Sequence, residues 1–349
     1  MRELLTEIQG SVGWITLNRP NVLNALSLGM IEEMTFLLKE WELDTALNAI
    51  VIQGSGEKAF CAGGDVRAVY EAKQRGDFLT CDRYFRQEYS LNAHIHEYTK
   101  PYISLIDGIA MGGGLGISVN GSHRIVTEKA VLAMPETGIG FFPDVGATTF
   151  LHKAPGAVGL YLGLTGTRVK AEDALWTGLA THFMPSSSLK LFKESLQTGA
   201  SLEDALITYC KQPVNKGFLE HHEDAINDHF DKCALKDIME SLKKDPSSFA
   251  QNTYNVLKAK SPTSLAVVFR QLQQGKTLSF IERMKQEFRL SQHFLANHDF
   301  REGVRAVLVD KDHLAHWKPA TLEGLDDQEI DTYFTSLGER ELILEGKQS

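Results

Sequence analysis

The sequence predicts an α/β protein whose amino-terminal part is a core of strands and helices and whose remainder is helical. Short apolar runs at 48–54 and 102–108 alternate with segments of helical periodicity over about the first 190 residues. Strand patterns then vanish, and charged helical patterns fill 186–261. We therefore expect an α/β core over 1–190. Over 191–349 we expect a helical insertion and a helical carboxyl-terminal region.

The first elements follow from polarity patterns and turn residues. Segments 2–9 and 12–18 alternate in polarity around a Gly-Ser turn, which predicts a β-hairpin. An amphipathic helix is predicted over 27–44, with its first serine as the N-cap. The apolar segment 48–54 then predicts a buried strand, and the glycine-rich turn 61–65 leads into the next helix.

Two helices are predicted over 66–73 and 78–98, followed by a buried strand at 102–108. A glycine-rich segment comes next, then strand pieces at 124–128 and 130–134, and short helices to about residue 179. Beyond the insertion, Ser261 followed by proline is a favourable helix start. A further helix is predicted to end near residue 297.

The tail beyond Pro319 is acidic, and we expect it to be loosely held.

Composition excludes several functional classes. The formal net charge of −9 disfavours non-specific binding to nucleic acid or to an anionic membrane surface. No stretch approaches the ~20 apolar residues that cross a bilayer. The first residues alternate as strands do and resemble neither a secretory signal nor a transit helix. We therefore predict a cytoplasmic location. The four cysteines form no CxxC pair, and we expect neither a metal site nor disulfides.

Two carboxylates, Glu136 and Asp144, stand in the segment MPETGIGFFPDVG, which prolines and glycines break. The other side chains of this segment are mostly apolar. A carboxylate that loses its hydration has a raised pKa, which suits proton transfer near neutral pH. The competing interpretation is that both acids are solvated in an exposed loop.

Three consecutive glycines, Gly112 to Gly114, precede the apolar segment LGISVN, which we predict to be a helix ended by Gly121 in the left-handed conformation. Such a run suggests unusual dihedrals or close approach to the backbone. Its free N–H groups could bind an oxyanion, and tight helix packing is the alternative explanation. The turn at 61–65 could supply a second donor to the same oxygen.

Other motifs fail on single residues. A dinucleotide-binding GxGxxG would need glycine at 117, where isoleucine stands, and a P-loop ending in GKT would need glycine in place of Arg270. The hydrolase motif GxSxG is missing around Ser118. Cys61 has no histidine near it in sequence, so we do not expect it to be a nucleophile.

Three segments resemble signature segments of the crotonase superfamily, and they are most similar to its branch of 3-hydroxyacyl-CoA thioester hydrolases. They are KAFCAGGDVRAVYE (58–71), GIAMGGGLGISVNGSHRI (108–125) and MPETGIGFFPDVG (134–146). The likeness continues through FRQEYSLN, KSPTSLAVVFRQL, FRLSQ and HDFREGVRAVLVDKD, and so covers nearly the whole chain. It implies a spiral of ββα turns with a helical carboxyl-terminal region.

The resemblance also implies a site. The backbone N–H groups of Gly64 and Gly113 would hold the thioester oxygen of an acyl-CoA. Enoyl-CoA hydratases carry a second glutamate where this chain has Gly116, so hydration is disfavoured. Glu136 would act on the thioester carbon, either as a nucleophile forming an anhydride or as a base activating water.

Asp144 would orient the 3-hydroxyl of the substrate or the water, and Glu88 would complete the polar pocket. The expected substrates are 3-hydroxyisobutyryl-CoA first and 3-hydroxypropionyl-CoA second, the former in valine degradation. For the CoA phosphates we name Arg19, Lys58, Arg67 and Lys311, although single basic residues are more often solvated.

No cofactor is expected, because CoA is part of the substrate. The family likeness suggests self-association through the carboxyl-terminal helices, although the helical insertion could cap that surface. Two alternatives stay open: an enoyl-CoA hydratase or isomerase of the same superfamily, and an inert acyl-CoA-binding subunit.

Overall fold

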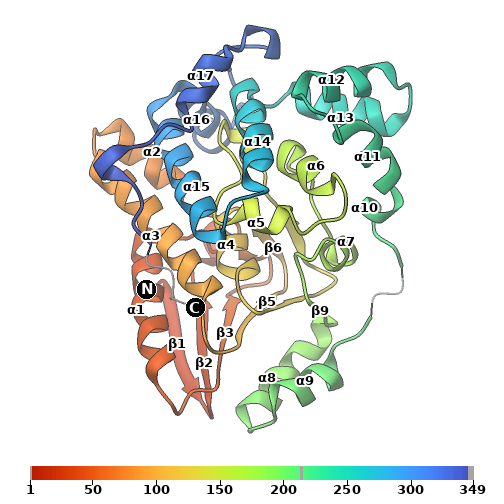
Figure 1. Ribbon diagram of the computed structural model, residues 1–349. Coiled ribbons are helices and arrows are strands. Elements are labelled where there is room, and N and C mark those ends of the chain that lie inside the picture. Colours follow the sequence, from red (N-terminus) through yellow and green to blue (C-terminus); the bar gives the residue numbers. More distant parts are fainter. Residues whose placement is uncertain (1, 213–214, 345–349) are drawn as a thin grey trace. The chain divides into compact units, whose positions relative to one another are not determined.

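A computed structural model describes residues 2–212 and 215–344 of the chain (Figure 1). The chain forms two compact units, each assembled from three separate segments. The first unit consists of 1–65, 90–133 and 168–220, and the second of 66–89, 134–167 and 221–349. We predicted two continuous regions, 1–190 and 191–349, that follow one another in sequence. That division stays a prediction.

The first unit holds the two sheets of the described chain. The larger has the strand order β1-β2-β3-β5-β7-β9, in which β1 and β2 form an antiparallel hairpin and the other neighbours pair in parallel. The predicted hairpin is therefore confirmed. The strands of this sheet are β1 (Leu4–Gln9), β2 (Val12–Leu17), β3 (Ala49–Gly54), β5 (Tyr102–Ile106), β7 (His123–Val126) and β9 (His182–Phe183).

The smaller sheet is parallel and has the order β4-β6-β8, with strands at Ala59–Cys61, Ile109–Met111 and Val131–Ala133. Three consecutive strand pairs, β3/β4, β5/β6 and β7/β8, each place the first strand in the larger sheet and the second in the smaller one. Helical structure follows each pair. This is the spiral of ββα turns that the sequence resemblance implies. Strands β4, β6 and β9 were not predicted.

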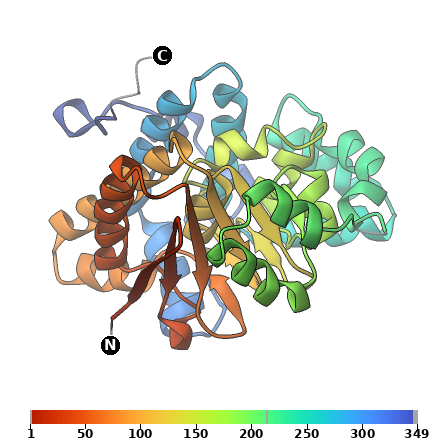
Figure 2. The ribbon, with the colours of Figure 1, turned by 90° about the horizontal axis from the view of Figure 1, so that it is seen from below.

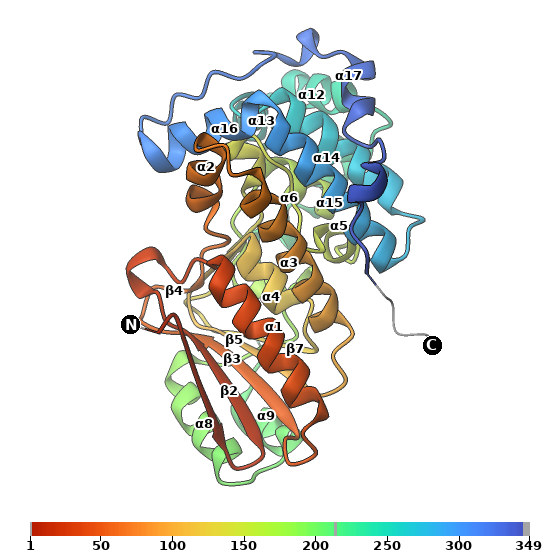
Figure 3. The same ribbon diagram turned by 90° about the vertical axis from the view of Figure 1, so that its left-hand side faces the viewer.

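Helices cover both faces of the larger sheet (Figures 2 and 3). Trp14, Val51 and Ile103 point to one face and pack with Phe192 of α8. On the other face, the ring of Trp41 in α1 lies so close to Gly13 that a Cβ there would approach it to 2.6 Å. The helices of the first unit include α1 (Leu28–Leu43), α4 (Gly113–Val119), α7 (Ala171–Trp176), α8 (Leu189–Gln197) and α9 (Leu202–Tyr209).

Gly121 is not the left-handed helix end that we predicted. Gly121 does not adopt a positive φ, and α4 ends at Asn120 in an ordinary helical conformation. Instead, a Cβ on Gly121 would stand 2.4 Å from the ring of Tyr102. The residue type is therefore explained by the close approach of an aromatic side chain.

The second unit is helical in its described part. It contains the predicted helix start at Ser261, whose Oγ accepts a 3.0 Å hydrogen bond from the Ser264 N–H. Ser279, which was not predicted as a helix start, forms a capping box with Glu282. Its helices include α2 (Val66–Gln74), α5 (Ala147–Leu151), α6 (Val158–Thr165), α11 (Glu223–Phe230), α12 (Leu235–Lys244), α13 (Ser248–Lys258), α14 (Pro262–Gly275), α15 (Phe280–Ala296), α16 (His298–Val304) and α17 (Asp327–Thr332).

Two helices run across the boundaries of the units in sequence, α3 (Phe78–His96) and α10 (Phe218–His221). Among the described residues, no helix is both long enough and apolar enough to cross a membrane.

An aromatic cluster forms the core of the second unit. Phe141 contacts the rings of Phe85, Phe294 and Phe300 at centroid distances of 5.7, 5.4 and 4.9 Å. The tail contributes too: Tyr333 lies 4.8 Å from Phe294, and Ile330 and Leu342 are also buried. The expectation of a loosely held tail is therefore wrong for these described residues, because their apolar side chains pack into the core.

Candidate active site

Two glycine turns lie side by side in the first unit. They follow β4 and β6, which are adjacent parallel strands, so both turns leave the same edge of the smaller sheet. Gly63 has φ +124° and Gly112 has φ +48°. A Cβ placed on Gly63 would lie 3.8 Å from the Gly113 nitrogen, which shows how closely the turns approach each other. The two turns are therefore neighbours, and the convergence of their N–H groups on one oxygen stays a prediction.

The N–H groups of Gly64 and Gly113 donate no hydrogen bond within the described residues. Gly113 is the first residue of α4, where a backbone N–H has no acceptor inside the helix. Gly64 pairs with Leu26 in an isolated bridge that uses the groups of its neighbours, Gly63 and Asp65. Both amides are thus free to bind an external oxygen.

The third glycine of the run has a packing role. A Cβ on Gly114 would stand 2.2 Å from the Cys61 carbonyl oxygen, so α4 can lie on β4 only if this residue is glycine. The packing explanation for the glycine run therefore holds at Gly114, and oxyanion binding by the Gly113 N–H stays a prediction. Cys61 itself is fully buried beneath α4.

The second unit contains the predicted carboxylates. The segment from Glu136 to Ile139 forms one 3-10 turn, which Gly140 ends with φ +67°. Glu136 is 7% exposed and Asp144 5% exposed, so the interpretation of solvated loop acids is wrong. Glu88 in α3 is 2% exposed and belongs to the same unit.

A tyrosine that the sequence analysis did not select completes this carboxylate group. The hydroxyl of Tyr89 donates a 2.6 Å hydrogen bond to Asp144 Oδ2. Oxygen atoms of Glu88 and Glu136 stay buried without a hydrogen-bond partner among the described residues. Buried polar atoms of this kind are uncommon and mark positions where a ligand or water can bind.

Burial determines the protonation of the cluster. It raises the pKa of Asp144 to about 7, although the Tyr89 hydrogen bond lowers it. Burial, and then the charge of Asp144, raise the pKa of Glu88 and of Glu136 well above the ordinary range. Carboxylates with raised pKa values that sit close together are typical of catalytic sites.

The positive charge of Lys260, at the end of the insertion, lowers the pKa of the Glu136 carboxyl. Burial lowers the pKa of the Lys260 amine. Two glycines make room for this amine. A Cβ on Gly138 would lie 3.3 Å from Lys260 Nζ, and one on Gly166 would lie 3.6 Å from it.

The four basic residues suggested for CoA phosphates differ in their surroundings. Arg19 is engaged with Glu3 and Asp65 at 3.1 and 3.0 Å. Arg67 pairs with Glu71 at 3.0 Å on the surface of α2. Lys58 and Lys311 are exposed. Their assignment to CoA stays a prediction.

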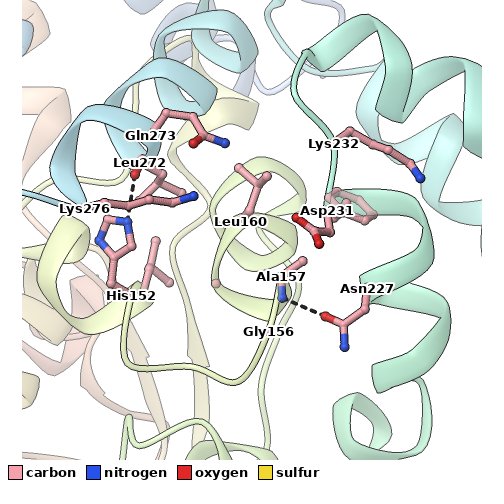
Figure 4. Close-up of a pocket in the computed structure, with 13 residues that line it drawn as sticks. His152, Gly156, Ala157, Leu160, Asn227, Asp231, Lys232, Leu272, Gln273 and Lys276 are labelled. Atoms are coloured by element: carbon pink, nitrogen blue, oxygen red, sulfur yellow. Dashed lines mark hydrogen bonds between the residues drawn. The ribbon is translucent and has the colours of Figure 1, made fainter.

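A cavity of about 530 Å³ opens elsewhere in the second unit, along α5, α6, α11 and α14 (Figure 4). Two of its polar side chains are engaged within the protein: His152 Nε2 lies 2.7 Å from the Leu272 carbonyl oxygen, and Asn227 accepts a 2.8 Å hydrogen bond from the Ala157 N–H. None of the described residues that line it is one of the predicted site residues. The carboxylate cluster is therefore separate from this cavity.

Three residues that were not predicted, Tyr89, Lys260 and Glu287, contact the carboxylates or change their pKa values. Tyr89 and Lys260 lie in segments that carried the resemblance, FRQEYSLN and KSPTSLAVVFRQL, but no local pattern distinguishes them from ordinary helix residues. A buried partner is found only once the helices are packed.

Comparisons with known proteins identify the family of the chain. The family model described as Enoyl-CoA hydratase/isomerase matches residues 12–334. The chain is similar to the mitochondrial 3-hydroxyisobutyryl-CoA hydrolases of Xenopus laevis, Rattus norvegicus and Homo sapiens, at 49%, 47% and 44% identity. The alignments cover 98%, 97% and 97% of this chain and 90% of each relative.

Solved structures give the same fold. A carnitinyl-CoA dehydratase from Mycobacterium thermoresistibile has a TM-score of 0.94 and 36% identity, covering 99% of this chain and 100% of that one. An enoyl-CoA hydratase from Rhodobacter sphaeroides has a TM-score of 0.93 and 32% identity, covering 98% and 100%. The predicted α/β fold of crotonase type is thereby confirmed.

Proposed function

Because the chain belongs to the enoyl-CoA hydratase/isomerase family, we propose that it hydrolyses 3-hydroxyisobutyryl-CoA to 3-hydroxyisobutyrate and CoA. The full-length similarity to hydrolases named for this substrate supports the activity, which belongs to valine degradation. The observation that carries the proposal is the buried group of Glu136, Asp144 and Glu88, with Tyr89 bonded to Asp144.

The thioester needs an attacking oxygen at its carbonyl carbon. Glu136 supplies it in one of two ways: its carboxylate attacks and forms an anhydride that water then opens, or it takes a proton from an attacking water. In both routes the carbon–sulfur bond breaks and CoA leaves as a thiolate, which is a good leaving group. Burial and the neighbouring Asp144 raise the pKa of Glu136, which makes its carboxylate a better proton acceptor in the second route.

Asp144 and Glu88 account for the choice of a 3-hydroxyacyl chain. A substrate hydroxyl can donate to a buried carboxylate, and an analogue without that hydroxyl leaves the carboxylate unpaired. Tyr89 donates to one oxygen of Asp144, and in this proposal the other oxygen accepts from the substrate hydroxyl. The proposal therefore includes selectivity for the 3-hydroxyl group.

The developing negative charge on the thioester oxygen is assigned to the amides of Gly64 and Gly113. Each donor of this type lowers the barrier by about 3 kcal/mol in known oxyanion holes. Their free N–H groups in the first unit support this assignment. Hydrolysis consumes only water, so the proposal includes no cofactor.

Hydration of an enoyl-CoA is the alternative that the structural neighbours suggest by their names. It requires two acid-base groups around one water, and Gly116 offers no side chain for the second. A cytoplasmic location and self-association are further parts of the proposal, although the relatives named above are called mitochondrial. Cell fractionation and light scattering test these two points.

The activity is tested by following free CoA with a thiol reagent. We expect rapid release from 3-hydroxyisobutyryl-CoA, slower release from isobutyryl-CoA, and slow loss of the crotonyl-CoA double bond. Equal release from the first two substrates would contradict the selectivity. Faster consumption of crotonyl-CoA than hydrolysis of either thioester would favour the hydratase.

A further inference from the structure

We propose that Glu287 of α15 is a positioning residue that holds the turn after Asp144 in the conformation used for catalysis, a role that rests on the proposed hydrolase function. Glu287 is completely buried and stands outside the three carboxylates assigned so far. Helix acids are rarely buried unless each oxygen has partners.

Both carboxylate oxygens of Glu287 bind the backbone that follows Asp144. Its Oε2 accepts a 2.7 Å hydrogen bond from the Gly146 N–H. Its Oε1 accepts bonds from the Thr148 N–H at 3.0 Å and from the Thr148 hydroxyl at 2.6 Å. A single side chain from α15 therefore binds Gly146, the N-cap of α5, and Thr148 in the first turn of that helix.

Gln271 of α14 holds the same turn from its other end. Its amide nitrogen donates to the Pro143 carbonyl at 2.9 Å and to Thr148 Oγ1 at 2.8 Å. Asp144 is thus enclosed by anchors on both sides, from two different helices.

The turn needs such anchors because its backbone is strained. Val145 has φ +55°, a region that β-branched residues rarely occupy, and Gly146 follows with φ +91°. Strain of this kind persists only where surrounding contacts over-determine the conformation, and it is concentrated at functional sites. Without Glu287, the turn would relax and carry Asp144 away from Tyr89.

The same helix also supports the hydrogen-bond donor of Asp144. Phe288, the next residue in α15, packs edge-on against the Tyr89 ring at a centroid distance of 6.3 Å. Glu287 holds the backbone that follows Asp144, and Phe288 packs against Tyr89, the hydrogen-bond donor of Asp144. Helix α15 therefore sets the geometry of the Tyr89–Asp144 pair.

The charge of Glu287 adds an electrostatic effect. When ionised, it raises the pKa of Asp144. Its own pKa is raised to about 7 by burial, against the effect of its three hydrogen bonds. Three titratable groups surround the pair of Asp144 and Glu287: Glu88 and Tyr89 of α3, and Glu136 of the preceding loop. Two cations also act on the cluster. Arg283 of α15 interacts with Glu287, and Lys260 interacts with Glu136.

Two substitutions of Glu287 separate the charge of the side chain from its reach. Glu287→Gln keeps the reach but removes the charge and one acceptor, because its NH2 group cannot accept the bond from the Gly146 N–H or from the Thr148 N–H. We expect the acid limb of the kcat–pH profile to move to lower pH. Glu287→Asp keeps the charge but shortens the reach, and we expect kcat to fall by about 100-fold with the acid limb unmoved, since small misplacements of catalytic groups cost this much. KM should change little in both. Glu329→Gln, an exposed carboxylate of α17, is the control and should alter neither quantity.

Hydrogen exchange of the peptide 141–150 gives a readout that does not depend on activity. We expect faster exchange in Glu287→Asp than in the wild type. Unchanged exchange together with an unmoved profile in Glu287→Gln would overturn the inference. If neither variant folds, wild-type exchange at 141–150 decides: slow exchange like that of α15 supports the clamp, and fast exchange like that of exposed loops refutes it. A wild-type protein that releases no CoA would refute the proposed function alone.

Discussion

Tyr89 and Asp144 form a buried pair in which the phenol donates to the carboxylate over 2.6 Å, 55 residues apart in the chain. The pair lies in apolar surroundings that make an ionised carboxylate costly. The hydrogen bond favours the ionised form of Asp144 against the effects of burial and of Glu287. The Tyr89 hydrogen bond therefore fixes the orientation of Asp144, a carboxyl group with a pKa of about 7.

Replacing Tyr89 by phenylalanine removes this donor and nothing else from the ring. We expect the pKa of Asp144 to rise, so the acid limb of the kcat–pH profile moves to higher pH, opposite to Glu287→Gln. At neutral pH kcat should fall by about tenfold, the equivalent of about 1.4 kcal/mol. Tyr209→Phe in the first unit is the matched control. An unmoved acid limb would show that Asp144 does not control the rate.

Stability should fall as pH rises. The pKa of Asp144 and that of Glu287 are each raised to about 7, so the folded protein holds protons that the unfolded chain releases above about pH 4. Their contribution is complete below the unfolded pKa and is lost as pH rises through the folded one. Urea unfolding at pH 5 and 8 measures this, and we expect the lower free energy of unfolding at pH 8.

Asp144→Asn should flatten this slope, because the uncharged amide does not titrate. The exposed Asp224 of α11 provides the control, since Asp224→Asn leaves the buried carboxylates intact. A slope unaffected by Asp144→Asn would mean that this carboxyl has an ordinary pKa in the folded protein.

Gly114→Ala tests the packing of α4 on β4. The new methyl group would stand 2.2 Å from the Cys61 carbonyl oxygen, a backbone atom that cannot rotate away. We expect a loss of about 1–3 kcal/mol in the free energy of unfolding, as in other overpacked cores. Gly29→Ala in α1 meets its nearest atom at 3.8 Å and should instead be neutral or stabilise by about 1 kcal/mol. Similar effects of both substitutions would contradict the packing described here.

The sequence predicted most elements because their signals are local. Ser27 and Ser261 are N-caps in the structure as they are in the pattern, and the buried strand at 49–54 is a short apolar run. Strands β4, β6 and β9 were not predicted, because runs of two or three residues carry no periodicity. The role predicted for Gly121 was wrong because the ring that approaches it, that of Tyr102, belongs to β5, a separate segment of the chain.

The residues of the site likewise fall into those that the sequence predicted and those that it did not. Glu136, Asp144 and the glycine turns were visible because prolines and glycines break the pattern around them. Tyr89 and Glu287 lie inside regular helices, where an acid or a tyrosine is normally half solvated. Only the packing of α3 and α15 against the Asp144 turn reveals that they are buried partners.

The central claim is that Glu136 and Asp144 carry out thioester hydrolysis. The most direct test is release of CoA from 3-hydroxyisobutyryl-CoA by Glu136→Gln and Asp144→Asn, with Glu329→Gln and Asp224→Asn as controls for the same charge changes. Circular dichroism establishes that each variant is folded. We predict that both site variants lose at least about 100-fold in kcat, the range typical of acid-base groups, while both controls keep wild-type rates. Folded site variants that release CoA at the wild-type rate would contradict the account.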